Sequence, residues 1–167
     1  MVPFLGELDF LLIQLNSCFS ISCPYHCFMS MLNKKEIALI KKSWNLLEKT
    51  DPVVVADIFY SKLFFENPEL RKMFPQDMKG QHKKFADMLD TVVARLENLD
   101  ELKGDIVALA KRHVDYGVKP LHYNMVGIAL LYTLQKTLGN EWTDEVRSAW
   151  INCYSILSGT MITVSNK

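Results

Sequence analysis

The chain has 167 residues, enough for one compact domain that buries a core without disulfides. Its 19 basic and 19 acidic side chains cancel, which argues against a surface that binds nucleic acid or another polyanion. Hydrophobic residues make up 49% of the chain, and glycine and proline number only seven and six, so the composition favours a helical globular protein with small molecules or proteins as partners.

The first thirty residues differ in composition from the rest, and they hold three of the four cysteines: Cys18, Cys23 and Cys27. They are apolar, but they lack a basic start and contain acidic residues, which argues against a signal peptide or a membrane span. Residues 1–30 are interpreted as an N-terminal extension that is flexible, loosely docked or an upstream leader. A zinc site formed by these cysteines with His26 stays open as an alternative, although their spacing matches no familiar zinc motif.

The pattern of residues 31–167 predicts one domain built of helices. A capping-box spacing at Asn33 and Glu36 starts the first helix, and Asp–Pro, Asn–Pro and glycine signals mark later helix ends. The helices are expected over 33–50, 52–66, 69–74, 79–97, 106–117, 120–138 and 144–164. No strand alternation is evident, so the prediction is an all-α fold of six or seven helices.

Two helices carry informative patterns. In the second, Lys62 and Glu66 are expected to face water. In 79–97, apolar residues recur at i, i+3, i+4, i+7, i+8 and i+11, which predicts a long amphipathic helix whose inward face is formed by Phe85, Met88, Leu89, Val92, Val93 and Leu96.

A histidine, His113, occupies a position where the helix over 106–117 calls for a hydrophobic residue. It follows Ile106, Leu109 and Ala110 at i, i+3, i+4 and i+7, so its imidazole is expected to project into the core. On spacing alone, a hydrogen-bonded core histidine and a ligand both remain open.

Three other residues favour a ligand. Tyr60 and Gln81 are polar residues near the inward faces of two other helices, and burial of each without a partner costs about 1–3 kcal/mol. Phe74 lies in a turn between them, where a large aromatic side chain needs something flat to pack against. A pocket filled by a planar cofactor accounts for all three residues together with His113.

A family pattern appears in six places in chain order: 59-FYSKLF-64, 67-NPELRKMF-74, Gln81 at the start of the long helix, 112-RHVDYGV-118, 122-HYNMVG-127 and 149-AWINCY-154. Over Leu32 to Val164 the chain resembles the globin family, in particular the bacterial single-domain haemoglobins and the haem domains of flavohaemoglobins. The resemblance implies an all-α globin fold of six to eight helices that encloses one haem, preceded by the extension.

The resemblance implies that His113 is the proximal ligand of the iron in haem b, which is held non-covalently because the chain has no CxxCH motif. Phe74 matches the aromatic residue that wedges the porphyrin, and Tyr60 and Gln81 match the distal pair. Lys84 pairs with a propionate, and the other matched pocket positions are Phe85, Leu109, Val118, Tyr123 and Val126. His82 is expected at the surface or the helix edge, because adjacent helical residues point about 100° apart.

One matched position departs from the flavohaemoglobin-like pattern. That pattern has a glutamate late in the last helix, which joins a tyrosine and the proximal histidine in a hydrogen-bonded set. Tyr123 matches the tyrosine, but Ser165 stands at the glutamate position. A neutral serine supplies no carboxylate charge, which puts a peroxidase-like push on the iron ligand in doubt.

The distal pair implies high-affinity, reversible binding of dioxygen by a pentacoordinate haem, with nitric oxide or carbon monoxide as further gas ligands. Nitric oxide dioxygenation with an external reductase, gas sensing, and a haem-free helical interaction module are the alternatives, so enzyme activity is left open. The expected setting is the cytoplasm, since Cys153 is the one cysteine after residue 30, with no nucleic acid or membrane span and a monomer or homodimer.

Overall fold

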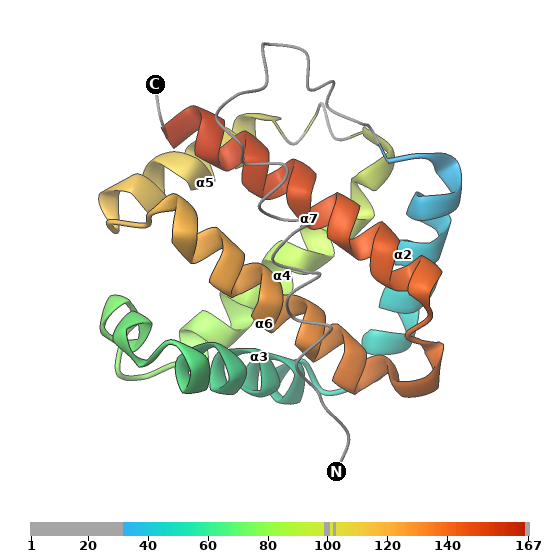
Figure 1. Cartoon of the computed structure of the whole chain (residues 1–167), viewed down its shortest axis with the longest axis horizontal. Helices are drawn as coiled ribbons and strands as arrows, with labels where there is room; N and C mark the ends of the chain where they lie inside the picture. The colour runs from blue at the N-terminus through green and yellow to red at the C-terminus, as the bar shows by residue number, and fades with distance from the viewer. Residues whose placement is uncertain (1–31, 99–100, 102, 166–167) are drawn as a thin grey trace. The chain divides into compact units, whose positions relative to one another are not determined.

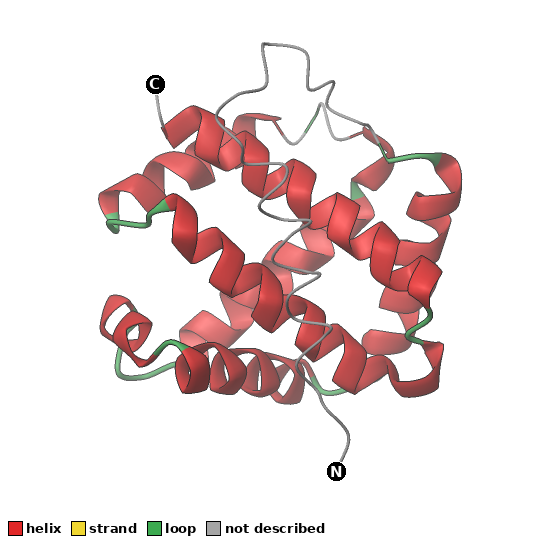
Figure 2. Cartoon of the chain, in the orientation of Figure 1, coloured by secondary structure: helices red, strands yellow, loops and turns green. Residues whose placement is uncertain are grey.

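Helices make up the regular structure of the computed structural model, which describes residues 32–98, 101 and 103–165 (Figures 1 and 2). Within these residues there is no strand, and no helix has the length and apolar run needed to cross a membrane. The prediction of an all-α globin fold is confirmed. The elements are α2 (Lys34–Leu47), α3 (Pro52–Glu66), η1 (Pro68–Met73), α4 (Lys79–Ala94), η2 (Leu96–Asn98), α5 (Lys103–Asp115), α6 (Pro120–Leu138), η3 (Gly139–Glu141) and α7 (Asp144–Ser165).

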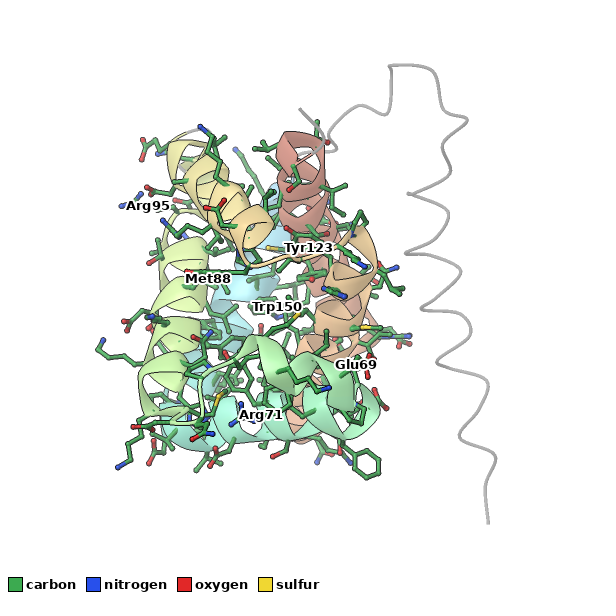
Figure 3. The ribbon with its side chains drawn as sticks, turned by 90° about the vertical axis from the view of Figure 1, so that its left-hand side faces the viewer. Glu69, Arg71, Met88, Arg95, Tyr123 and Trp150 are labelled. Carbon is green, nitrogen blue, oxygen red and sulfur yellow. The ribbon has the colours of Figure 1, made fainter. Side chains whose placement is uncertain are left out.

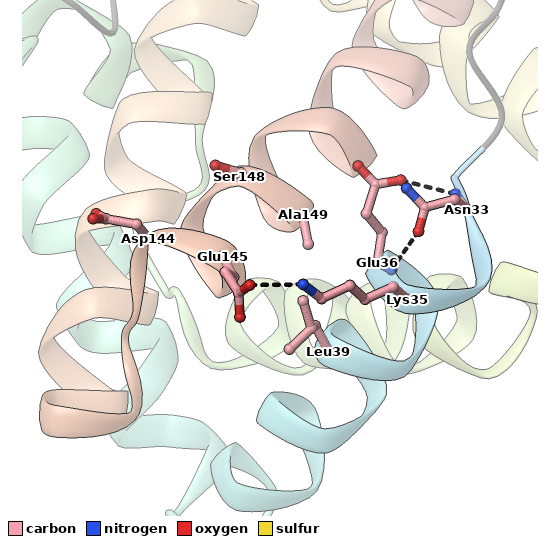
Figure 4. Close-up of a pocket in the computed structure, with 8 residues that line it drawn as sticks. All are labelled: Asn33, Lys35, Glu36, Leu39, Asp144, Glu145, Ser148 and Ala149. Carbon is pink, nitrogen blue, oxygen red and sulfur yellow. Dashed lines mark hydrogen bonds and ion pairs between the residues drawn. The ribbon is translucent and has the colours of Figure 1, made fainter.

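The helix starts follow the capping signals of the sequence. The Asn33 side chain accepts a hydrogen bond from the Glu36 amide (3.0 Å), and the Glu36 carboxylate accepts one from the Asn33 amide (2.8 Å), as Figure 4 shows. Asp51 caps α3 through the amide of Val53 (2.8 Å). The proposed boundary at residue 31, the extension over 1–30 and its zinc alternative fall outside the described residues.

Three details differ from the predicted pattern. α2 ends at Leu47 rather than near Thr50, because the last amides bond three residues back, as from Thr50 to the Leu47 carbonyl (2.8 Å). Met88 is 37% exposed, since it lies at the edge of the face whose centre is formed by Phe85, Leu89 and Val92. Lys62 does not simply face water, because its ammonium lies 4.4 Å from the centre of the Tyr132 ring.

Helix α6 contacts both of the helix groups that carry the predicted site residues. α6 runs beside α7 in Figure 1, and it also packs against α3, which in turn contacts α4 and η1. α5 packs on α7. Trp150 of α7 is almost fully buried, and its indole N–H donates to the Ser43 hydroxyl of α2 (3.0 Å). Figure 3 shows Trp150 in the interior, with α4 and α6 on opposite sides of it.

The close approach of α6 and α7 depends on Gly127. A Cβ at this position would lie 2.6 Å from Cε1 of Tyr154, nearer than real Cβ atoms come to other atoms. The Tyr154 ring cannot move away freely, because its hydroxyl donates to the Tyr123 carbonyl oxygen (2.6 Å). Gly127 and Tyr154 therefore hold the first turns of α6 in place on α7.

We expect Gly127→Ala to lower the free energy of unfolding by about 1–3 kcal/mol, because the added methyl group overpacks a site closed by a hydrogen-bonded ring. Urea denaturation monitored by circular dichroism measures the change. Gly159→Ala in α7 is the matched control, since a Cβ there meets nothing within 4 Å, and it should raise stability by up to about 1 kcal/mol. Equal effects of the two substitutions would contradict the close approach at Gly127.

Candidate functional site

His113 lies near the C-terminal end of α5 and is half-buried. Its Nδ1 is 2.9 Å from the carbonyl oxygen of Leu109. A carbonyl oxygen can only accept, so Nδ1 carries the proton and donates it. Burial lowers the pKa of the imidazole, and the nearby Arg112 lowers it further, while the Leu109 carbonyl opposes them. The ring is therefore neutral at neutral pH, and Nε2 keeps a free lone pair.

Tyr123, at the start of α6, stacks beside this imidazole with ring centroids 6.1 Å apart and planes 20° apart. Around Tyr123, the described chain forms an apolar group of Ile106, Leu109, Ala110, Val118, Leu157 and Met161. The structure therefore brings together four predicted positions from α5, α6 and the turn between them, namely Leu109, His113, Val118 and Tyr123. Val126 lies three residues further along α6 and is half-buried.

The Tyr123 hydroxyl is buried and has no hydrogen-bond partner within the described part of the chain. Burial raises the pKa of this phenol, and the Ser165 hydroxyl opposes the rise by a smaller amount. Ser165 directs its own hydrogen bond to the Met161 carbonyl (2.8 Å) and makes none of ordinary geometry with Tyr123. The side chains behind His113 are therefore neutral, in keeping with the departure noted at position 165.

Tyr60 of α3 is the centre of a second group, the Tyr60 cluster, made of the rings of Phe59, Tyr60, Phe64, Phe74 and Phe85. Tyr60 is only 5% exposed. Burial raises the pKa of its phenol to about 12, and the neighbouring Gln81 side chain lowers it by a smaller amount. The hydroxyl thus stays protonated as a donor, with the Gln81 amide beside it.

Gln81 and His82, neighbours at the start of α4, both lie against Tyr60. The His82 side chain is only 14% exposed, so it lies at the helix edge rather than at the surface. The His82 ring stacks on Tyr60 at 5.3 Å, and its Nδ1 lies 3.5 Å from a carboxylate oxygen of Asp57. Both partners belong to α3, so His82 faces the edge of α4 that packs on α3. Lys84, the predicted propionate partner, has an exposed side chain.

Arg71 is a residue of the site that sequence reasoning missed. Its guanidinium, labelled in Figure 3, donates to the carbonyl oxygens of Phe74 (3.1 Å), Pro75 (2.9 Å) and Gln76 (3.2 Å). It also lies 5.4 Å from the centre of the Phe64 ring. Arg71 therefore shapes the turn that carries Phe74 and directs that ring against Tyr60, 5.6 Å away. The one signal for it was its place inside the segment 67–74.

The clefts on the surface of the described domain include two with defined lining residues. One, drawn in Figure 4, lies between the N-terminal ends of α2 and α7, where Lys35 pairs with Glu145 (2.6 Å). None of the predicted site residues lines it. The other lies between α2, the start of α3 and α4, and it includes Phe85.

The all-α fold thus carries a neutral histidine on α5, and a buried tyrosine on α3 beside a half-buried glutamine of α4. The family model for globins matches residues 57–161, so the chain belongs to the globin family. Membership implies that the chain binds haem and a gas ligand such as dioxygen.

Its relatives include proteins of similar length and proteins that are much longer. Neuroglobin from Tetraodon nigroviridis is 34% identical over 80% of this chain and 92% of its own length. Flavohemoprotein from Oceanobacillus iheyensis is 30% identical over 81% of this chain, which spans only 36% of that protein. The structure of a bacterial globin from Campylobacter jejuni superposes with a TM-score of 0.71 at 26% identity, over 80% of this chain and 96% of that one.

We expect Arg71→Lys to speed the loss of haem, because a lysine ammonium cannot hold three carbonyl oxygens with the planar fork that the guanidinium provides. Transfer of haem to an excess of an acceptor apoprotein measures the rate. The matched control is Lys72→Ala, next along η1, whose side chain is exposed. If both variants lose haem at the rate of the wild type, Arg71 has no positioning role.

Proposed function

We propose that the chain binds dioxygen reversibly and with high affinity through a pentacoordinate haem b, which His113 holds non-covalently. The observation that carries this proposal is the hydrogen bond from His113 Nδ1 to the Leu109 carbonyl (2.9 Å). It selects the tautomer whose Nε2 can ligate iron, and it orients the ring. Haem bound there would supply a ferrous iron that takes one diatomic gas.

The Tyr60 hydroxyl and the Gln81 amide serve this ligand as hydrogen-bond donors. Tyr60 suits the role because burial raises the pKa of its phenol to about 12, so it keeps its proton at any physiological pH. Donation to a ligand that gains negative charge is stronger than donation to a neutral one. The pair therefore favours dioxygen over carbon monoxide and slows the release of dioxygen.

The remaining pocket positions have supporting roles. Phe74 and Phe85 pack against the cofactor ring, and Leu109, Val118, Tyr123 and Val126 form the walls around His113. Lys84, exposed at the start of α4, pairs with a propionate. The site lies in a cytoplasmic setting, which suits Cys153, a buried free thiol.

Removal of the proposed iron ligand, His113, tests this proposal directly. We expect His113→Ala to abolish or shift the Soret band of the purified protein, since it removes the nitrogen that ligates iron. The comparison variant is His82→Ala, which removes a histidine from the Tyr60 side and should keep the Soret band, because the iron ligand stays in place. A His113→Ala spectrum identical to that of the wild type refutes the proposal. A low-spin ferric spectrum that disappears in His82→Ala would assign the distal position to His82 instead of Gln81.

We expect Tyr60→Phe to speed dioxygen release about 5- to 12-fold, which corresponds to the loss of one hydrogen bond of roughly 1–1.5 kcal/mol. The substitution keeps the ring and its packing in the Tyr60 cluster, so the haem content should not change. Stopped-flow displacement of dioxygen by carbon monoxide gives the rate. An unchanged rate removes Tyr60 from the mechanism.

A second candidate function is nitric oxide dioxygenation. It is favoured by the Tyr60–Gln81 pair together with the similarity to a flavohemoprotein. Conversion of one nitric oxide and one dioxygen into nitrate consumes one electron from the ferrous iron, so repeated turnover needs an external reductase. The surroundings of His113 favour reversible binding as the first choice, because within the described residues its Nδ1 bonds to the Leu109 carbonyl and not to a carboxylate that would strengthen electron donation.

Stopped-flow mixing of the oxygenated protein with nitric oxide distinguishes the two functions. If dioxygenation is the function, the spectrum should convert to the ferric form within the mixing time, with one nitrate produced per haem. Slow conversion, with the oxygenated spectrum persisting, would count against the enzyme and leave reversible binding in place.

A further inference from the structure

The cleft between α2, the start of α3 and α4 has a volume of ≈ 290 Å³. Its floor is apolar and buried, whereas its rim is exposed and partly acidic. The floor residues are Trp44, Leu47, Val55, Phe85 and Leu89, and the exposed rim residues are Glu48, Pro52 and Asp90. The cleft is therefore a solvent-accessible depression that leads to apolar side chains.

The floor of this cleft is also a wall of the Tyr60 cluster. The Phe85 ring stacks on Phe59 with centroids 4.2 Å apart, and its centroid lies 5.8 Å from that of Tyr60. Phe85 is the predicted site residue that lines the cleft. Phe85 is therefore in contact with the Tyr60 ring and lines the cleft as well.

The chemistry of the cleft selects small uncharged molecules. Its volume of ≈ 290 Å³ has room for a small molecule, and its apolar floor favours one without charge. The Asp90 carboxylate is fixed at the rim by the Trp44 indole N–H (2.9 Å), and Glu48 is nearby on the same rim. These two negative charges oppose the entry of anions but have little effect on a neutral diatomic gas.

We propose that this cleft is an entry path for the gas ligand and that the Phe85 ring is its gate. This inference rests on the proposed function, because it assumes a haem between His113 and Tyr60. The gate opens when Phe85 leaves its stack on Phe59, so the stack controls how often gas passes.

Filling the cleft tests the path. Ala86 lines it and is half-buried, so Ala86→Trp places an indole in the opening without replacing a floor residue. If the cleft carries most of the gas, the bimolecular rate of carbon monoxide binding after flash photolysis should fall by more than about twofold. Ala94→Trp is the matched control, at an exposed position of the same helix, and should leave the rate unchanged. An unchanged rate in Ala86→Trp overturns the inference.

The gate is tested by a double substitution. Phe85→Ala alone enlarges the pocket and should raise the binding rate, whichever route the gas takes. In Phe85→Ala/Ala86→Trp this gain should disappear, because the opened gate then leads to a filled cleft. A gain that survives in the double variant places the entry elsewhere and overturns the inference.

A measurement that does not depend on haem separates this inference from the proposed function. Xenon added under pressure should shift the methyl resonances of Val55, Ala86 and Leu89 in the NMR spectrum, and the shifts should vanish in Phe85→Trp, which reduces the floor space. Absence of xenon shifts overturns the path even when the protein carries haem. Absence of a Soret band in the wild type refutes the proposed function, while the xenon shifts still decide whether the cleft takes an apolar gas.

Discussion

The hydrogen bond between His113 and the Leu109 carbonyl is the interaction on which the rest of the site depends. It joins residues one helical turn apart, so the backbone of α5 itself fixes the tautomer of the ring. Because burial lowers the pKa of the imidazole, the ring does not take up a second proton near neutral pH. A ligand for iron is thereby available without any charged partner, and the apolar packing behind the ring does not have to accommodate an ion.

The neutral state of the His113 imidazole explains why position 165 can be a serine. A carboxylate behind Tyr123 would bring a charge into a group formed by Ile106, Ala110 and Met161, which needs compensation. Ser165 instead satisfies its hydroxyl on the helix backbone at Met161. The cost is a Tyr123 hydroxyl without a partner within the described residues, which is a polar group left at the rear of the site. With His113 as the proposed iron ligand, this arrangement makes the imidazole a modest electron donor.

Helical periodicity was enough to predict most of the fold and the position of His113, because each amphipathic helix reports its own buried face. It failed where a neighbouring element decides the outcome. Lys62 is held over Tyr132, which lies 70 positions further along the chain, and no local pattern contains that contact. Met88 illustrates the opposite error, since it fits the spacing but lies at the edge of the apolar face.

The residues of the candidate site also fall into two groups: those that a local sequence pattern predicts and those that depend on the path of the chain. His113, Tyr60 and Gln81 stood out in the sequence as polar residues on inward faces, and the resemblance to globins added their roles. Arg71 did not stand out, because its importance comes from three backbone carbonyls of a turn that has no regular pattern. Residues that act through backbone geometry are recognised only when the path of the chain is known.

Gln81 and Phe85 lie one turn apart on α4, and this spacing lets one helix control two separate properties of the pocket. Gln81 lies beside the Tyr60 side chain, and in the proposed function it strengthens the hold on the ligand; Phe85 contacts Tyr60 and lines the cleft, and in the proposed path it sets how quickly a ligand enters and leaves. Affinity is the ratio of the release rate to the binding rate, and a gate on the path changes both rates by the same factor, so it leaves the affinity to the hydrogen-bond donors. A globin that retains dioxygen through two donors would bind it slowly if the pocket were closed, and an apolar path behind Phe85 allows tight binding and rapid entry together.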